Sequence, residues 1–539
     1  MSHELIVSEI RSGTGVTDER VIGALSRGSR TERFAICRDL SMAFAAVGEL
    51  RRSRILADRA YNLWDGDAVF ADYYTGLIRA DGDVSVLREV TKRVGIRMAE
   101  NGDLMAALGY FNQHHYAYQS LGYGDRYFYD FDILKAIESL AGVKSGHPLP
   151  RSSGQPGSRP LRVAYLVFGA SHTNSVLIRL LLEFARYHRR QEIECSFFSP
   201  DARCEARDVN TSFFSAVGTS LIVVDSEDEQ FCLLETEERL REAKPDVVVS
   251  VAALADYRQY YLFAASAADV RVALCYGPPA QYVPPRADWT IAATRHPLLD
   301  SPCDGETIPI EVELPKRPEC PGTLPGEVVI PENAILMLAA GRSEKFLCRE
   351  YWETVLEVVV AHPNVYFVAC GLMFPPAFLD ELLVDEFRGR VWVLGWLEDY
   401  RNLLARADLV IDTYPSGGGL TIIDSMAFGI PVLSFMNDYL KPFDQVNWNL
   451  SEEFLCIPEL IVQRGDWSDF RNKLKKLIGD RSLRQLLGKV CQKNAEEMFG
   501  NPERMVRRFE ESYIRLYQSV LPHSEGFLQR WRRKLGWCR

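Results

Sequence analysis

Apolar residues follow two different patterns along the chain, and the change from one to the other falls near residue 150. Before it, small, aromatic and aliphatic residues recur at helical spacing in segments such as 57–63 and 105–118. After it, short continuous apolar runs alternate with amphipathic stretches of helical period. This second pattern is typical of buried parallel strands joined by helices. The sequence therefore predicts an all-α region followed by an α/β region.

Residues 1–145 form the predicted helical domain. Its helices are separated by turns in which a glycine precedes an acidic and an apolar residue, at Gly48, Gly82 and Gly102. The first two turns lie 34 residues apart, the period of tetratricopeptide (TPR) repeats, but the third follows after 20. We therefore predict a degenerate, TPR-like domain. It could hold a protein acceptor or a second subunit, or it could simply cap the domains that follow.

The rest of the chain divides at two segments of loop composition. Residues 146–160 are rich in Pro, Gly and Ser and predict a linker, and residues 311–331 are rich in Pro and Glu and predict a connection between two sheets. We expect one doubly wound, Rossmann-like domain over 161–315 and a second over 316–522. The predicted strands are 161–168, 193–198, 221–224, 247–251 and 271–275, then 334–340, 365–370, 391–394, 409–411 and 432–435, and a helix is expected over 378–387.

The most distinctive stretch, 407–435, has the sequence ADLVIDTYPSGGGLTIIDSMAFGIPVLSF. A buried strand is followed by a loop with three successive glycines, Gly417, Gly418 and Gly419, and then by a helix that begins at Leu420. Exposed backbone N–H groups and the helix dipole favour phosphate at such a place. Thr421 adds a hydroxyl in the first turn, and Asp424 could accept hydrogen bonds from ribose. Neither the Walker ending nor the spaced dinucleotide fingerprint is present.

Two further candidates follow strands at the edge where parallel sheets bind ligands. His172, in the loop after the first predicted strand, could act as a general base, because histidine exchanges protons near neutral pH. It could also cap the next helix or contact phosphate. Lys345 follows the first strand of the second domain, where a fixed ammonium would stabilise charge on a departing diphosphate. Arg342 is a second candidate for that role.

Composition and charge argue against several classes of protein. A net charge of −11 argues against a general nucleic-acid-binding protein. The first residues lack the apolar core of a signal peptide, and no uncharged apolar run approaches the roughly 18–20 residues that span a bilayer. The 12 cysteines are scattered without a C-x-x-C pair, which favours reduced core thiols over structural zinc. We therefore expect a cytoplasmic protein with no metal site.

With these residues in place, the stretch 407–435 resembles the nucleotide-sugar loop of GT-B glycosyltransferases. It is most similar to family 41, which holds the O-GlcNAc transferases and the bacterial cytoplasmic protein N-glucosyltransferases. The match consists of Asp412-x-Tyr414-Pro415, then Gly417, then Ile422-Ile423-Asp424. The resemblance implies that the loop and helix start hold the donor diphosphate and that Asp424 contacts the ribose. Retaining GT-B enzymes carry two glutamates across this loop; Ser416 and Asp424 stand there instead, which favours an inverting enzyme.

The resemblance also assigns roles to residues elsewhere. It implies that His172 and Lys345 are catalytic, and that Trp396 lies where relatives contact the base. The loop from Gly277 to Pro279 resembles the one that lines the sugar and acceptor cleft, although Pro278 replaces the usual ring or histidine side chain and leaves the sugar preference open. The predicted donor-binding residues are Lys345, Arg342, Gly417, Gly418, Gly419, Leu420, Thr421, Asp424, Trp396, Gly277 and Pro279.

The expected architecture is thus GT-B: an N-terminal all-α domain is followed by two Rossmann-like domains with a cleft between them. The expected activity is inverting, metal-independent transfer of a sugar from UDP-GlcNAc or UDP-Glc to a protein side chain, with no cofactor. Three alternatives remain open. The acceptor could be a glycan or a lipid, the chain could be a nucleotide-sugar epimerase of the same fold, or it could be a non-catalytic partner. The last is favoured by Gly419-Leu420, where O-GlcNAc transferases carry His-Thr.

The C-terminal end carries two further predictions. Residues 502–520 form an amphipathic helix of the kind that crosses back to the first sheet in GT-B enzymes. Residues 523–539 form a basic amphipathic tail, with Phe527, Leu528, Trp531 and Leu535 on one helical face. The tail could touch an anionic membrane, pack on its own protein, or join two copies of the chain.

Overall fold

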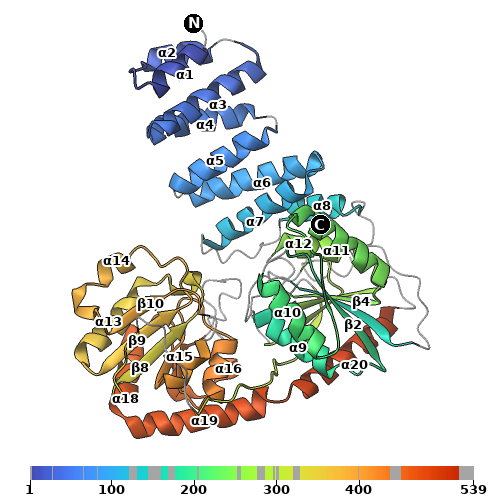
Figure 1. The fold of residues 1–539 in the computed structure, drawn as a ribbon, viewed down its shortest axis with the longest axis vertical. Coiled ribbons are helices and arrows are strands. Elements are labelled where there is room, and N and C mark those ends of the chain that lie inside the picture. The colour runs from blue at the N-terminus through green and yellow to red at the C-terminus, as the bar shows by residue number, and fades with distance from the viewer. Residues whose placement is uncertain are drawn as a thin grey trace, which may run out of the picture. The chain divides into compact units, whose positions relative to one another are not determined.

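The computed structural model describes most of the chain between residues 3 and 520. The described ranges are 3–26, 28–64, 66–81, 83–120, 130–143, 159–167, 176–202, 205–251, 256–275, 284, 286–294, 298, 301, 303–319, 328–397, 400–436 and 451–520. They form two compact units, a helical unit made of Met1–Leu121 with Asp130–Leu140, and an α/β unit made of the remainder (Figure 1). The predicted tail over 523–539 lies outside the described residues.

The helical unit contains helices that pack against their neighbours in the chain, with α3 on α4 and α6 on α7. Glycines with φ near +80°, Gly48 and Gly102, end α3 and α6, and Asp83 and Asp103 then accept hydrogen bonds from backbone amides at the start of α6 and α7. The predicted turn at Gly102 and Asp103 therefore works as both a helix stop signal and a start signal. The helices are α1 His3–Arg11, α2 Asp18–Leu25, α3 Arg30–Ala46, α4 Leu50–Leu63, α5 Ala68–Asp81, α6 Val84–Glu100, α7 Leu104–Ser120 and α8 Phe131–Leu140.

The first sheet of the α/β unit has seven parallel strands in the order β3-β2-β1-β4-β5-β6-β7. They are β1 Leu161–Leu166, β2 Ile193–Ser199, β3 Leu221–Val223, β4 Val247–Val251, β5 Val270–Cys275, β6 Trp289–Ala292 and β7 Gly305–Thr307, with helices α9 Val176–Tyr187, α10 Glu205–Ala216, α11 Glu229–Ala243 and α12 Tyr257–Ala265. Buried apolar residues fill β1, β4 and β5, as expected for strands covered on both faces. The sequence pattern missed β6 and β7, which are short.

The second sheet has six parallel strands in the order β10-β9-β8-β11-β12-β13. They are β8 Ile335–Ala340, β9 Val365–Cys370, β10 Val391–Leu394, β11 Leu409–Ile411, β12 Val432–Phe435 and β13 Ile461–Val462. Among the helices are η3 Ser343–Phe346, α13 Arg349–Ala361, α15 Tyr400–Arg406, α16 Leu420–Ala427, α17 Ser451–Phe454, η6 Pro458–Leu460, α18 Trp467–Gly479, α19 Arg481–Phe499 and α20 Pro502–Val520. In Figure 1 this sheet lies between α13 on one side and α15 and α16 on the other.

One predicted helix, 378–387, is wrong as a single element. The segment contains the short helix α14 Leu379–Leu382 and the 3₁₀ turn η4 Asp385–Phe387. Leu383 separates them with ψ of 68°, outside the helical region, so the backbone cannot continue the first helix into the second.

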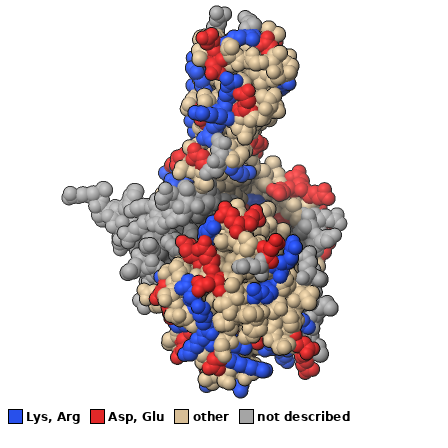
Figure 2. Space-filling model, turned by 90° about the vertical axis from the view of Figure 1, so that its left-hand side faces the viewer, with Lys and Arg blue, Asp and Glu red and all other residues tan. Residues whose placement is uncertain are grey.

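The α/β unit is closed by α20, which packs against α9 and β5 of the first sheet. Figure 1 shows α20 in red, running from α19 to the first sheet. The two parallel sheets, their helices and the preceding helical unit confirm the predicted α/β architecture. None of the helices in the described ranges combines the length and apolarity needed to cross a membrane. Figure 2 shows acidic and basic side chains interspersed on one face of the molecule.

Candidate functional site

The glycine loop after β11 is held by one buried carboxylate. Asp412 accepts hydrogen bonds from the backbone amides of Thr413 (2.9 Å) and Gly418 (2.7 Å), and from the hydroxyl of Ser434 (2.6 Å). The Thr413 hydroxyl donates to the Ser416 carbonyl at 2.6 Å. These bonds close the loop on itself, so the glycines are presented in a defined conformation.

An aromatic cluster packs against the same loop at Tyr414. The ring of Tyr414, which precedes a cis proline, packs edge-on against Phe435 and Trp467. The Arg464 guanidinium lies 4.7 Å from the centre of the Tyr414 ring and donates to the Pro415 carbonyl. Sequence reasoning missed Arg464, because a cation 49 residues away from the loop carries no local signal.

Helix α16 begins directly after the glycines. The first backbone hydrogen bond at its start runs from the Ile422 amide to the Gly419 carbonyl. The amides of Leu420 and Thr421 therefore come before the first hydrogen-bonded turn of the helix. A Cβ atom on Gly418 would lie 3.3 Å from an Asp412 carboxylate oxygen and 3.5 Å from Cβ of Thr421. A side chain at that position would therefore fit only tightly. Backbone N–H groups at the start of a helix, like those here, are the donors that bind anions in other proteins.

The predicted cation meets the predicted loop. Lys345 lies in η3, just after β8, and its ammonium donates to the Gly417 carbonyl at 2.5 Å across 72 residues of sequence. A Cβ on Gly341 would be 3.0 Å from the Thr413 methyl and 3.3 Å from Cδ of Lys345, so the backbone just after β8 lies close to both Thr413 and Lys345. Arg342 is exposed at the start of η3. The structure thus brings Lys345, Gly417 and the start of α16 together.

The ends of β8, β9 and β10 converge at the same edge of the sheet. Gly371 has φ of +92°, and a Cβ there would lie only 2.5 Å from the Gly341 carbonyl oxygen. The Gly371 amide donates to the Gly395 carbonyl at 2.9 Å. Three large apolar side chains are exposed around this edge, Trp396 together with Met373 and Phe374. Sequence reasoning missed the last two, although apolar residues immediately after a buried strand could have indicated them.

Asp424, predicted to contact ribose, is fully buried and already has protein partners. Both of its oxygens accept from the Arg179 guanidinium, at 2.9 and 3.0 Å, and one also accepts from the Tyr400 hydroxyl at 2.5 Å and from Arg401 at 3.3 Å. Burial and then the Asp424 carboxylate raise the pKa of Tyr400 well above its ordinary value, so the phenol stays protonated and donates. The ribose contact remains a prediction.

The other predicted residues of the first domain, His172, Gly277 and Pro279, lie outside the described residues. The strands that precede them are β1 and β5, which flank β4 at the middle of the first sheet. No group of three or more His, Cys, Asp or Glu side chains suited to a metal occurs in the part of the chain that the structure describes.

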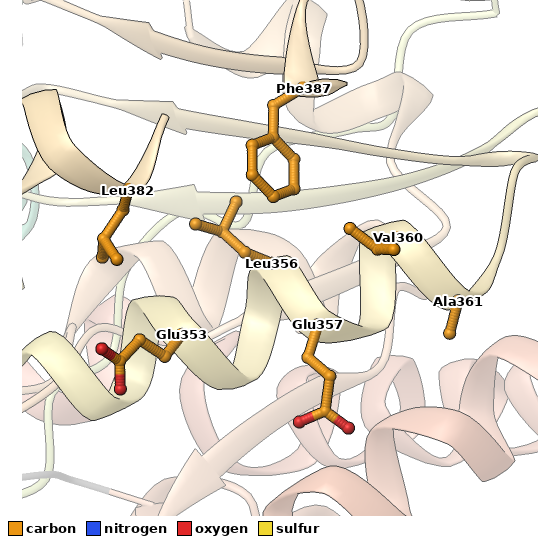
Figure 3. Close-up of a pocket in the computed structure, with 7 residues that line it drawn as sticks. All are labelled: Glu353, Leu356, Glu357, Val360, Ala361, Leu382 and Phe387. Carbon is orange, nitrogen blue, oxygen red and sulfur yellow. The ribbon is translucent and has the colours of Figure 1, made fainter. Parts of the chain in front are cut away.

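A cavity of about 420 Å³ lies elsewhere, on the outer side of α13 (Figure 3). Leu356, Val360 and Phe387 gather at its apolar side, whereas Glu353 and Glu357 project from another side of the helix. Glu353 and Glu357 each pair with an arginine, at 2.8–2.9 Å. Apolar side chains and paired carboxylates are not what a nucleotide diphosphate requires, so this cavity is not the candidate donor site.

Comparison with known proteins bears on the fold. No protein-family profile and no curated protein sequence matches the chain. Among solved structures, a mutant O-GlcNAc transferase from Thermobaculum terrenum is similar with a TM-score of 0.58 and 15% identity, covering 97% of this chain and 99% of that one. A sucrose-phosphate synthase from Thermosynechococcus elongatus has a TM-score of 0.48, 15% identity, and covers 67% and 100%. The apo lipopolysaccharide outer core galactosyltransferase WaaB has a TM-score of 0.42, 12% identity, and covers 65% and 99%.

At these identities the similarity concerns the fold. The likeness to the first of these structures extends over nearly the whole chain, the helical unit included. The predicted architecture is therefore confirmed: the chain has a GT-B-like fold of two parallel α/β sheets, preceded by an all-helical region.

Proposed function

We propose that the chain is an inverting, metal-independent glycosyltransferase that moves a sugar from UDP-GlcNAc or UDP-Glc to a protein side chain. The observation that carries this proposal is the contact between the Lys345 ammonium and the Gly417 carbonyl, at the start of α16. A lysine, a glycine loop and the N-terminus of a helix meet at the carboxyl end of a parallel sheet, where such sheets bind nucleotides.

The chemistry follows from the charge that develops in the reaction. The acceptor atom attacks the anomeric carbon, the bond from that carbon to the diphosphate oxygen breaks, and the acceptor proton passes to a base. Negative charge grows on the leaving diphosphate, and the Lys345 ammonium with the backbone amides at the start of α16 would stabilise it. These groups supply the positive charge that a metal ion supplies in other enzymes. A single displacement of this kind inverts the configuration at the anomeric carbon.

Other residues take supporting roles in the proposal. His172 is the proposed base, and Gly277 and Pro279 would line the acceptor side. The exposed rings and thioether at the ends of β9 and β10 would form an apolar surface for the nucleobase of the donor. Trp396 is the member of this group that the sequence predicts. Arg342 would add a second cation near the phosphates.

The ribose is proposed to meet Asp424. Each carboxylate oxygen offers about two acceptor positions, and Oδ1 accepts from one protein donor whereas three donors crowd Oδ2. Oδ1 therefore keeps acceptor capacity for a ribose hydroxyl, once a neighbouring group moves aside to expose it.

The helical unit supports a protein acceptor. A stacked set of helix pairs offers an extended surface of the kind that binds polypeptides. The similarity to the O-GlcNAc transferase structure covers 97% of this chain, so it includes the helical unit, and 99% of that chain. A protein acceptor is therefore part of the proposal. Action in the cytoplasm is also part of it, because scattered cysteines without a C-x-x-C pair favour reduced thiols.

The test is donor turnover by the full-length protein. UDP release from UDP-GlcNAc and UDP-Glc is measured with and without lysate protein, with and without EDTA, and modified side chains are located by mass spectrometry. We expect turnover that EDTA leaves unchanged and that Lys345→Ala lowers by roughly 10²–10³-fold. The control is Lys473→Ala, because that lysine also donates to a backbone carbonyl at 2.5 Å, but beside β13. Absence of turnover with every donor, or equal turnover in both variants, would contradict the proposal.

A further inference from the structure

Helix α9 of the first sheet and helix α16 of the second are joined by one ion pair. The two terminal nitrogens of Arg179 donate to the two oxygens of Asp424 at 2.9 and 3.0 Å, across 245 residues of sequence. The side chain of Asp424 is 0% exposed and that of Arg179 is 20% exposed. The pair is therefore a desolvated, two-point contact between two sheet domains.

This contact differs from an ordinary surface ion pair, which contributes little to stability or geometry. The planar guanidinium matches both carboxylate oxygens at once, a fit that a lysine ammonium cannot reproduce. Tyr400 and Arg401, from the start of α15, donate to the same carboxylate. Although burial lowers it, attraction to Asp424 raises the pKa of Arg179 above its ordinary value, so the cation persists. Asp424 is thus fixed from two elements besides its own helix.

The ion pair lies near the N-terminal end of each of the two helices. Asp424 lies one helical turn beyond Leu420, the first residue of α16, whose N-terminal amides are the proposed diphosphate donors. Arg179 lies in the first turn of α9, which begins at Val176, four residues after His172 in the chain. An α-helix of eight residues is only about 12 Å long and moves as a rigid rod. Holding Asp424 therefore holds the phosphate-binding end of α16 relative to α9.

We propose that Arg179 is a positioning residue, which through Asp424 sets the donor-binding end of α16 against the acceptor-side domain. The expected effect of Arg179 on donor binding rests on the proposed function. Its expected effect on the position of α16 rests on geometry alone. It assigns to an arginine of the first domain a share in donor binding that requires no contact with the donor. It is compatible with a ribose contact, because the pair leaves acceptor capacity on Oδ1 of Asp424.

The test compares Arg179→Met and Arg179→Lys with Arg186→Met. Arg186 lies on the same helix and pairs with Glu313, away from α16, so its loss removes the same charge without releasing Asp424. Hydrogen exchange of residues 416–427 is measured without ligand, and donor KM and kcat are measured by UDP release. We expect Arg179→Met to speed exchange in this segment and to raise the donor KM by about tenfold or more, since small misplacements of binding groups are costly. Arg179→Lys should show a smaller increase in KM, and Arg186→Met should show neither change.

The design separates positioning from simple loss of folded protein. Partial unfolding lowers apparent kcat by reducing the active fraction and leaves KM unchanged, whereas misplaced donor groups raise KM. If Arg179→Met does not fold, because Asp424 is left as an unpaired buried charge, the double variant Arg179→Met with Asp424→Asn removes both charges, and its hydrogen exchange without ligand is measured instead, since its KM would also report the proposed ribose contact. Unchanged exchange and unchanged KM in an active background would overturn the proposal. A wild-type chain that turns over no donor would overturn the proposed function, while the exchange comparison would still decide whether Arg179 holds α16.

Discussion

The return of α20 to the first sheet depends on a buried carboxylate, and its replacement gives a quantitative prediction. Glu510 is 0% exposed and accepts from His188 (3.1 Å), from the Arg189 backbone amide and side chain (2.7 Å each), and from Arg507 (2.9 Å). His188 in turn lies 2.7 Å from the Tyr165 hydroxyl of β1. The carboxylate therefore ties α20 to the end of α9 and to the sheet.

The magnitude follows from the protonation behaviour of the same group. Burial alone would raise the pKa of Glu510, but the hydrogen bonds from His188, Arg189 and Arg507 outweigh it and lower the pKa from 4.5 to about 2. That difference corresponds to about 3 kcal/mol of unfolding free energy at neutral pH. Because the folded-state pKa is the lower one, this stabilisation is fully present above pH 4.5 and is lost as the pH falls from 4.5 to about 2. Breaking one partner of a buried pair costs about 3–5 kcal/mol by independent experience, which agrees.

We therefore expect Glu510→Gln to lower the unfolding free energy by about 3 kcal/mol at pH 7, measured by urea unfolding with tryptophan fluorescence. The gap between wild type and variant should shrink to about 1 kcal/mol at pH 3. Glu503→Gln is the matched control, because Glu503 also pairs with Arg507 on the same helix but is exposed. It should cost less than about 1 kcal/mol. Equal effects of the two variants, or a pH-independent gap for Glu510→Gln, would refute the reasoning.

Two further predictions concern the second sheet domain. Gly488→Ala should lower the unfolding free energy, measured in urea, by about 1–3 kcal/mol or more, because the new Cβ would lie 2.1 Å from the Gly429 carbonyl oxygen. Gly479→Ala is the control and should not lower it, because the new Cβ would have no neighbour within 4 Å. Asp412→Ala should abolish donor binding in calorimetry by releasing the glycine loop, whereas Asp412→Asn should retain most of it, since its amide can donate to the Ser434 hydroxyl. Similar binding by the Ala and Asn variants would contradict the second prediction.

Local patterns were sufficient to predict most of the second sheet. The strands expected over 365–370, 391–394, 409–411 and 432–435 occur with those bounds, because each is a short, largely apolar run bounded by polar or turn residues. The sequence also predicts that Lys345 faces the glycine loop, since the ends of parallel strands meet at one edge, but it does not indicate the hydrogen bond from Lys345 to the Gly417 carbonyl. β13, with two residues, is too short to show a period, and it exists only through pairing with β12.

Long-range pairings could not be predicted in the same way. Arg179 lies on a helix whose charged residues are expected to face solvent, and nothing near it in the chain indicates Asp424 as its partner. Arg464 and Glu510 likewise owe their roles to residues tens to hundreds of positions away. Such contacts are decided by how elements distant in the sequence pack in the folded chain, which periodicity does not encode. The candidate site is therefore better predicted at its backbone than at the side chains that hold it.

The most direct test of the account is calorimetric binding of UDP, GDP, CDP, dTDP and their common sugars to the full-length protein. The donor site is proposed to consist of Lys345, the loop Gly417–Gly419 and the start of α16. We predict that UDP and a UDP-sugar bind, that Lys345→Ala abolishes this binding, and that Lys473→Ala leaves it unchanged. Absence of binding by every nucleotide in the panel, or retention of full affinity in Lys345→Ala, would contradict the proposed site.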